Sequence, residues 1–77
     1  MVHIEFTIEP FVEGHPGAHV LAAVEAARRL GVTVDMGPFG SSCDVERHEV
    51  GGLVSAVTDA AIGLGATHVS IHVEQEA

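Results

Sequence analysis

The sequence predicts a two-layer α+β fold with the element order β-α-β-β-α-β, and three observations predict it. Residues 2–10 and 66–74 alternate apolar and polar side chains, which is typical of strands with one buried face. Residues 17–30 and 46–64 carry apolar side chains at helical spacing. Between the two helices, residues 32–46 form two short strands folded about Gly37 and Pro38, since these residues suit a turn.

The first strand has two chemically distinct faces and ends at Pro10. Its apolar face consists of Val2, Ile4, Phe6 and Ile8. Its polar face consists of His3, Glu5, Thr7 and Glu9. The last strand repeats this design, with a polar face of His68, Ser70, His72 and Glu74. We expect both apolar faces to pack on the helices.

Each predicted helix has one apolar stripe and ends at a glycine, Gly31 for the first and Gly65 for the second. The first stripe contains Val20, Ala23, Val24, Ala27 and Leu30. The second contains Val50, Leu53, Val54, Val57, Ala61 and Leu64. Asp44 is a candidate cap for the second helix. Gly51 and Gly52 weaken that helix, and close packing against a strand or a partner would be a reason to keep them.

These elements form a single ferredoxin-like domain over residues 1–77, with an antiparallel sheet of order 4-1-3-2 and both helices on one face. The other face is polar and uncovered. This topology also brings several loops to one edge of the molecule, where the special residues gather. They are Phe11, His15, His19, Phe39, Ser41 and His68, with Glu9 and Glu13 adding negative charge. The two phenylalanines could stack on a flat ligand ring or simply plug the core.

Composition limits the partners of the chain. Eleven acidic residues against three arginines give a formal charge of -8, which disfavours nucleic acid and acidic membranes and favours cationic ligands. No apolar run reaches the length of a membrane span, and no signal peptide is evident, so we expect a cytoplasmic protein. The single cysteine, Cys43, agrees with a reducing compartment. A chain of 77 residues has a small core, so we expect a homodimer or homotetramer.

Four segments carry a resemblance to a known family. They are residues 1–10, Ala23-Val24-Glu25-Ala26, the run from Gly37 to Asp44, and Gly63-Leu64-Gly65-Ala66. Together they make the chain similar to the YkoF-like family of small thiamine-binding proteins, as a member with a single repeat. The likeness spans nearly the whole chain. It departs from the family at Ser41, where threonine is common, at Asp44, where glutamate is common, and at the pair Ser42-Cys43, where apolar residues are usual.

The resemblance implies a ferredoxin-like fold, association through the sheets, and binding of thiamine or its hydroxymethylpyrimidine half. Thiamine is a cation with an aminopyrimidine ring, so its recognition calls for a carboxylate, hydroxyl groups and an aromatic wall. The residues that fit these roles are Glu5, Thr7, Phe11, Phe39, Ser41, Ser42 and Asp44. Alternatively, Asp44 only caps a helix and the serines only satisfy a sheet edge.

Other classes of function remain open. Cys43 beside Asp44, with His68 across the sheet, would suggest a nucleophile and a base of an enzyme. A lone cysteine in a strand is more often a packing residue. We therefore expect no catalysis. A metal site would use His3, Glu5, His68 and His72, with His3 nearly opposite His72 on the neighbouring strand. Metal binding is a minor alternative. We predict no metal and no cofactor. The same histidines could make a pH-sensitive interface. The alternative to ligand binding is a self-assembling structural or regulatory module.

Overall fold

The computed structural model describes residues 1–12 and 15–75, so the predicted contribution of Glu13 lies outside the described residues. The element order is β1 (Val2–Glu9), α1 (Ala18–Arg29), β2 (Asp35–Met36), β3 (Ser41–Val45), a short 3-10 turn η1 (Arg47–Glu49), α2 (Val50–Gly63) and β4 (His68–Gln75). The predicted order β-α-β-β-α-β is confirmed.

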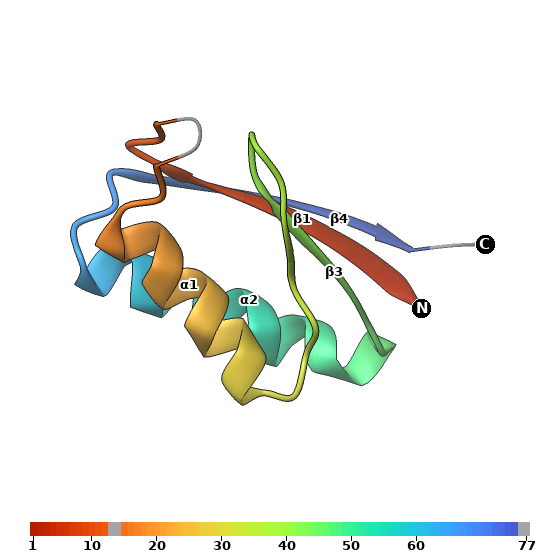
Figure 1. Ribbon diagram of the computed structural model, residues 1–77. Coiled ribbons are helices and arrows are strands. Elements are labelled where there is room, and N and C mark those ends of the chain that lie inside the picture. Colours follow the sequence, from red (N-terminus) through yellow and green to blue (C-terminus); the bar gives the residue numbers. More distant parts are fainter. Residues whose placement is uncertain (13–14, 76–77) are drawn as a thin grey trace.

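The four strands form one antiparallel sheet in the order β2-β3-β1-β4. Read from the other edge, this is the predicted order 4-1-3-2. Both helices lie against the same face of the sheet, while the opposite face carries no helix among the described elements (Figure 1). The structure is therefore the predicted α+β sandwich with a ferredoxin-like topology.

The core is made by the apolar faces of the strands and the stripes of the two helices. The fully buried side chains with the largest volumes are Ile4, Ile8, Val24, Val45, Leu53 and Val57. Val50, Ala66, Val69 and Ile71 pack against this core while remaining partly exposed. Burial of each large aliphatic side chain contributes about 1.5–3 kcal/mol to the hydrophobic stabilisation.

Glycines end both helices as predicted. Gly31 and Gly65 have φ angles of 83° and 96°, the left-handed region that favours glycine. The predicted stripes extend one residue too far at this end of each helix. Leu30 and Leu64 are 49% and 56% exposed, because each follows the last helical residue and no longer faces the sheet.

Asp44 does not cap the second helix, which corrects one prediction. It lies within β3, and the cap is formed instead by Glu46 and Glu49 in a reciprocal capping box. The backbone N–H of Glu46 donates to Oε1 of Glu49 at 2.8 Å, which supports the 3-10 turn that precedes α2. None of the helices in the described part of the chain is long and apolar enough to cross a lipid bilayer.

The hairpin between β2 and β3 is shorter and tighter than the sequence suggests. Val32 and Val34 are buried, but only Asp35 and Met36 form β2. The N–H of Gly37 donates to the carbonyl of Gly40 at 2.7 Å and closes the turn. A Cβ at Gly40 would lie 3.1 Å from the Phe6 carbonyl oxygen and 2.9 Å from Oγ1 of Thr7. The absence of a side chain at Gly40 thus allows the turn to lie directly against β1.

We expect Gly40→Val to lower the free energy of unfolding by about 1–3 kcal/mol, because the new side chain would push the turn away from β1. The matched control is Gly51→Ala in α2, where a Cβ would have no neighbour within 4 Å. The control should raise stability by about 1 kcal/mol through helix propensity. Urea unfolding of both variants measures this. A neutral Gly40→Val would show that the turn is not held against β1.

Candidate functional site

The sheet face away from the helices is a ladder of acidic, hydroxyl and imidazole side chains. Register pairs His3 with Glu74, Glu5 with His72, Thr7 with Ser70 and Glu9 with His68. On the other side of β1, His3 lies opposite Asp44 and Glu5 lies opposite Ser42. Most of these side chains are exposed. The predicted polar face is therefore present, and opposite charges face each other across it when the histidines are protonated.

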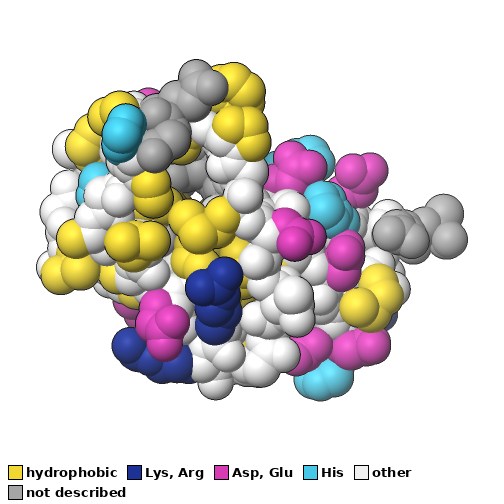
Figure 2. Space-filling model, viewed as in Figure 1, with side chains coloured by type: hydrophobic (Ala, Val, Ile, Leu, Met, Phe, Trp, Pro, Cys, Tyr) yellow, Lys and Arg dark blue, Asp and Glu magenta, His cyan; other side chains and the backbone are white. Residues whose placement is uncertain are grey.

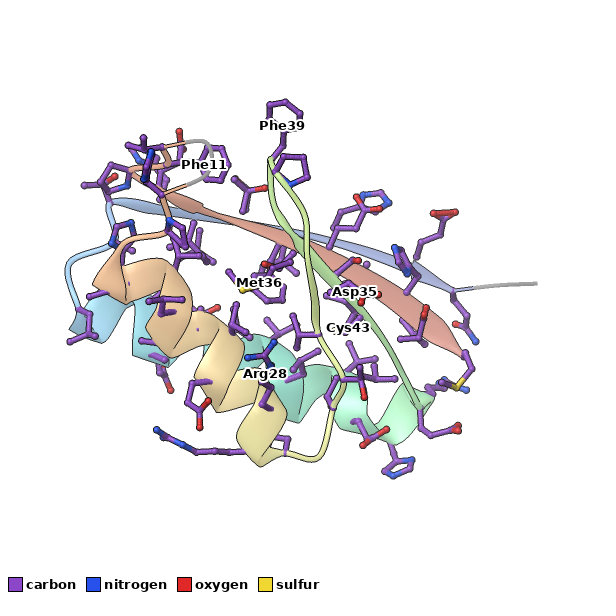
Figure 3. The ribbon with its side chains drawn as sticks, viewed as in Figure 1. Phe11, Arg28, Asp35, Met36, Phe39 and Cys43 are labelled. Atoms are coloured by element: carbon purple, nitrogen blue, oxygen red, sulfur yellow. The ribbon has the colours of Figure 1, made fainter. Side chains whose placement is uncertain are left out.

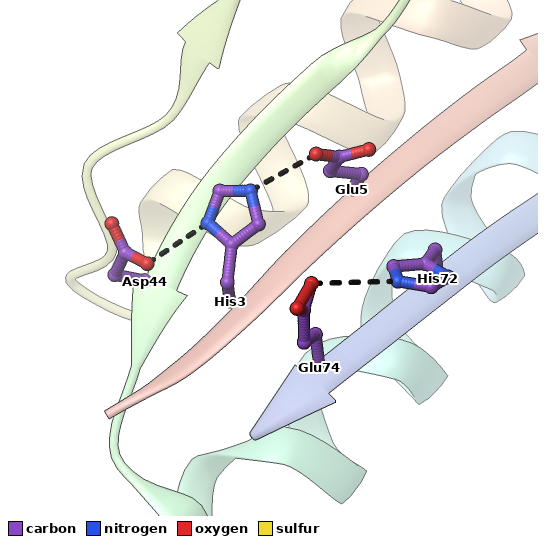
Figure 4. Close-up of polar contacts among 5 residues, drawn as sticks. All are labelled: His3, Glu5, Asp44, His72 and Glu74. Carbon is purple, nitrogen blue, oxygen red and sulfur yellow. Dashed lines mark hydrogen bonds and ion pairs between the residues drawn. The ribbon is translucent and has the colours of Figure 1, made fainter. Parts of the chain in front are cut away.

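His3 is held by two carboxylates. Its Nδ1 lies 2.9 Å from Oδ1 of Asp44, and its Nε2 lies 3.1 Å from Oε1 of Glu5 (Figure 4). Both ring nitrogens donate when the imidazole is protonated, so this arrangement favours the cation. The hydrogen bond to Asp44, followed by that to Glu5, raises the pKa of His3 above its usual value of 6.5.

The histidines on this face do not converge as a metal site would require. His3 pairs with Glu74 and His72 pairs with Glu5, so the expected near-opposite placement of His3 and His72 is wrong. His72 instead lies 3.8 Å from Glu74, and His68 lies 3.9 Å from Glu9. Within residues 1–12 and 15–75, no group of three or more His, Cys, Asp or Glu side chains is placed to hold a metal ion.

A pocket of about 380 Å³ opens on this polar face beside the hairpin, and we call it the outer pocket. Its polar side chains are Glu5 and Thr7 of β1, Asp35 of β2 and Ser42 of β3, and the ring of Phe39 stands at its edge. Ser41 also lines it, but the Ser41 side chain is buried on the core face, where it pairs with Phe6. The hydroxyl of Thr7 donates to the Phe39 carbonyl at 3.4 Å, which links β1 to the turn. The outer pocket thus combines carboxylates, hydroxyls and one aromatic ring.

A second pocket, the inner pocket, lies on the helix side of the same hairpin and has a volume of about 300 Å³. Its walls are mainly apolar and include Phe6, Ile8, Phe11, Val20 and Met36. Phe11 and Phe39 therefore line different pockets rather than forming one aromatic wall, and Figure 3 shows Phe39 at the tip of the hairpin and Phe11 by the loop after β1. Figure 2 shows apolar side chains gathered at the end of the molecule that carries the loops, and acidic and histidine side chains together at the strand side.

The structure brings five of the seven predicted binding residues to the outer pocket and separates two. Glu5, Thr7, Phe39, Ser41 and Ser42 line it. Phe11 lines only the inner pocket, and Asp44 lines neither, because it lies further along β3 beside His3. Phe39 lies in the turn before β3, whereas Ser41 and Ser42 lie within that strand.

Asp35 lines the outer pocket although the sequence reasoning did not select it. It pairs with Ser42 across the hairpin, and this register places both on the polar face. The sequence could have predicted this placement from the turn at Gly37 to Gly40, because a four-residue turn pairs Met36 with Ser41 and Asp35 with Ser42. A second carboxylate beside Glu5 increases the attraction of the pocket for cations.

Cys43 points into the core rather than toward a binding surface. It is 3% exposed, and burial, followed by the charge of Asp44, raises the pKa of its thiol. The thiolate is the nucleophilic form of cysteine, so this environment disfavours reactivity. The structure places Cys43 among packing residues.

We expect His3 to titrate above 6.5 in NMR spectra, and Asp44→Asn to lower its pKa toward that value. The control is Asp59→Asn, which makes the same change in charge at an exposed residue of α2, away from His3. Because the pKa is raised on folding, protonated His3 adds stability that is complete below about pH 6.5 and is lost as pH rises through the folded pKa. The stability lost in His3→Asn should therefore be larger at pH 5.5 than at pH 8.5. A wild-type His3 that titrates at or below 6.5 would contradict the hydrogen-bond geometry.

No protein-family model matches the sequence, and no curated protein matches it. Solved structures do match. A domain of unknown function, DUF77, from Bacillus cereus has a TM-score of 0.72 at 22% identity, with 97% of this chain and 75% of that chain covered. A Thermotoga maritima protein with a provisional assignment to thiamine biosynthesis or salvage has a TM-score of 0.71 at 18% identity, with 97% and 83% covered. A Streptococcus pneumoniae protein has a TM-score of 0.70 at 21% identity, with 99% and 84% covered.

These identities establish similarity of fold. They support the resemblance to the YkoF-like family at that level, because the neighbours share the whole arrangement of strands and helices with this chain. The chain therefore has the compact ferredoxin-like α+β fold of the DUF77 domain and its structural neighbours.

Proposed function

We propose that this chain is a non-catalytic binding protein for thiamine or its hydroxymethylpyrimidine moiety, that it acts in the cytoplasm as a homodimer or homotetramer, and that it binds the ligand in the outer pocket. The observation that carries the proposal is the meeting of Glu5, Asp35 and Phe39 around one pocket with two hydroxyl side chains, those of Thr7 and Ser42. The provisional thiamine assignment of the Thermotoga maritima fold neighbour supports the same ligand class.

Each group in the outer pocket has a role that thiamine chemistry requires. A carboxylate accepts hydrogen bonds from the exocyclic amino group, and hydroxyls pair with ring nitrogens. Glu5 uses Oε1 for His3, which leaves Oε2 for a ligand. Phe39 is 67% exposed, so its ring has a free face on which a flat heterocycle can stack. The two carboxylates and the chain charge of -8 favour a cationic ligand.

The buried thiol of Cys43 supports the non-catalytic part of the proposal, because a raised thiol pKa keeps the group protonated near neutral pH. The oligomeric part is supported by the sheet itself. One face of it carries no helix among the described elements, and β4 is an eight-residue edge strand. Analytical ultracentrifugation would show a monomer if this part is wrong, without bearing on ligand binding.

Calorimetric titration of thiamine and of hydroxymethylpyrimidine into the protein tests the ligand. We expect saturable binding that Phe39→Ala weakens about tenfold, equal to about 1.4 kcal/mol. Glu5→Gln should weaken it by a factor on the order of 10 to 100, because a hydrogen bond to a charged group is lost. At a ligand concentration 100 times the dissociation constant, the folded state should gain about 2.7 kcal/mol.

The matched control is Phe11→Ala, which removes the aromatic ring on the other side of the hairpin and should leave thiamine affinity unchanged. Asp44→Ala should also have a small effect, since Asp44 lies outside the outer pocket. Heats indistinguishable from dilution would remove thiamine as the ligand. The alternative function, a self-assembling structural or regulatory module, would then be favoured.

A further inference from the structure

The inner pocket is unused by the proposed function, and its chemistry differs from that of the outer pocket. No ionisable side chain lines it among the described residues. Of the lining residues that the structure describes, Ser41 alone has a side-chain oxygen or nitrogen atom, and it is 6% exposed. An apolar wall with one hydroxyl disfavours charged ligands, because a buried charge without a partner loses its hydration.

The walls of the inner pocket include side chains of the core and the described residues Phe11, Val12 and Pro16. Phe6 and Ile8 are each 2% exposed, and Val20 is 7% exposed, so none can move without disturbing the core. Pro10, which follows β1, is linked to α1, because Nε2 of His19 lies 2.6 Å from the Pro10 carbonyl oxygen. A Cβ at Gly17 would lie 2.7 Å from the His19 ring, so glycine provides the space for this contact.

The mouth of the inner pocket exposes apolar side chains that an occupant would cover. Val12 is 60% exposed and Met36 is 41% exposed, and both line the pocket. Apolar surfaces without contacts on one side lose dispersion energy, which an apolar occupant restores. Burial of the exposed surface would add hydrophobic stabilisation.

We propose that the inner pocket is a second binding site, which takes an uncharged, flat aromatic molecule of about two fused rings with one hydrogen-bonding group for Ser41. The size follows from the volume. A dry apolar cavity of about 150 Å³ holds one benzene ring, and the inner pocket is about 300 Å³. The inner pocket shares its hairpin wall with the outer pocket, but its apolar lining suits an uncharged molecule, whereas the fixed charge of thiamine suits the carboxylates of the outer pocket.

Indole is a suitable probe, because the chain contains no tryptophan or tyrosine and indole emission can be read without background. Titration of the full chain with indole should give a saturable blue shift with one site. Phe11→Ala should weaken binding at least fivefold. Phe39→Ala, the matched control in the outer pocket, should change it less than twofold. Circular dichroism establishes that both variants are folded.

Two further variants keep the test decisive. Val12→Glu places a charge at the exposed mouth, where folding tolerates it, and should abolish indole binding. Ser41→Ala should reduce the affinity for indole relative to benzothiophene, which has the same shape without the N–H donor. A general loss of apolar contact in Ser41→Ala would weaken both molecules equally, so the ratio of the two affinities reports the hydrogen bond alone.

Three results would overturn the proposal. Absence of saturable indole binding would show that the inner pocket is not a site. Loss of indole binding in Phe39→Ala but not in Phe11→Ala would place indole in the outer pocket. Displacement of indole by thiamine, with both weakened by Phe11→Ala, would show one shared site. Failure of thiamine to bind while indole binds would reject the proposed function alone.

Discussion

The position of β1 between β3 and β4 is the constraint on which the rest of the structure depends. As an internal strand, β1 is hydrogen-bonded along both edges, so its register is set by its pairing with β3 and by its pairing with β4. Its alternation then assigns every second side chain to the core and every other one to the polar face. A slip of one residue would bury the Glu5 carboxylate and expose Ile4. The free-energy cost of burying that charge is larger than a core of this size could offset.

This constraint explains why much of the fold can be predicted from the sequence. Unbroken alternation in residues 2–9 and 68–74 predicts strands, and Gly31 and Gly65 mark the helix ends because both adopt positive φ angles. The strand order follows from the connection rules for this element sequence. The exact start of α2 could not be predicted, because Asp44 is the residue type that favours a cap, whereas its pairing with β1 keeps it in a strand and leaves the capping to Glu46 and Glu49.

The binding region is harder to predict because it depends on faces rather than on proximity in the sequence. Phe11 and Phe39 both lie near the same end of the molecule, yet Phe39 is in the hairpin turn and lines the outer pocket, whereas Phe11 is in the loop after β1 and lines the inner pocket. Ser41 and Ser42 are adjacent but have opposite orientations, since neighbours in a strand point to opposite faces. Asp44 was chosen for its chemical type, but its carboxylate is engaged by His3. Residue types alone do not show on which face a side chain lies or which neighbour already binds it.

The hairpin also has a consequence for how the two pockets relate. Phe6, Met36, Gly37, Pro38, Gly40 and Ser41 line both of them. The partition is therefore a single peptide hairpin, and any displacement that enlarges one pocket does so at the expense of the other. Occupants on the two sides would sense each other through this partition, and linkage requires that the effect on affinity be equal in both directions.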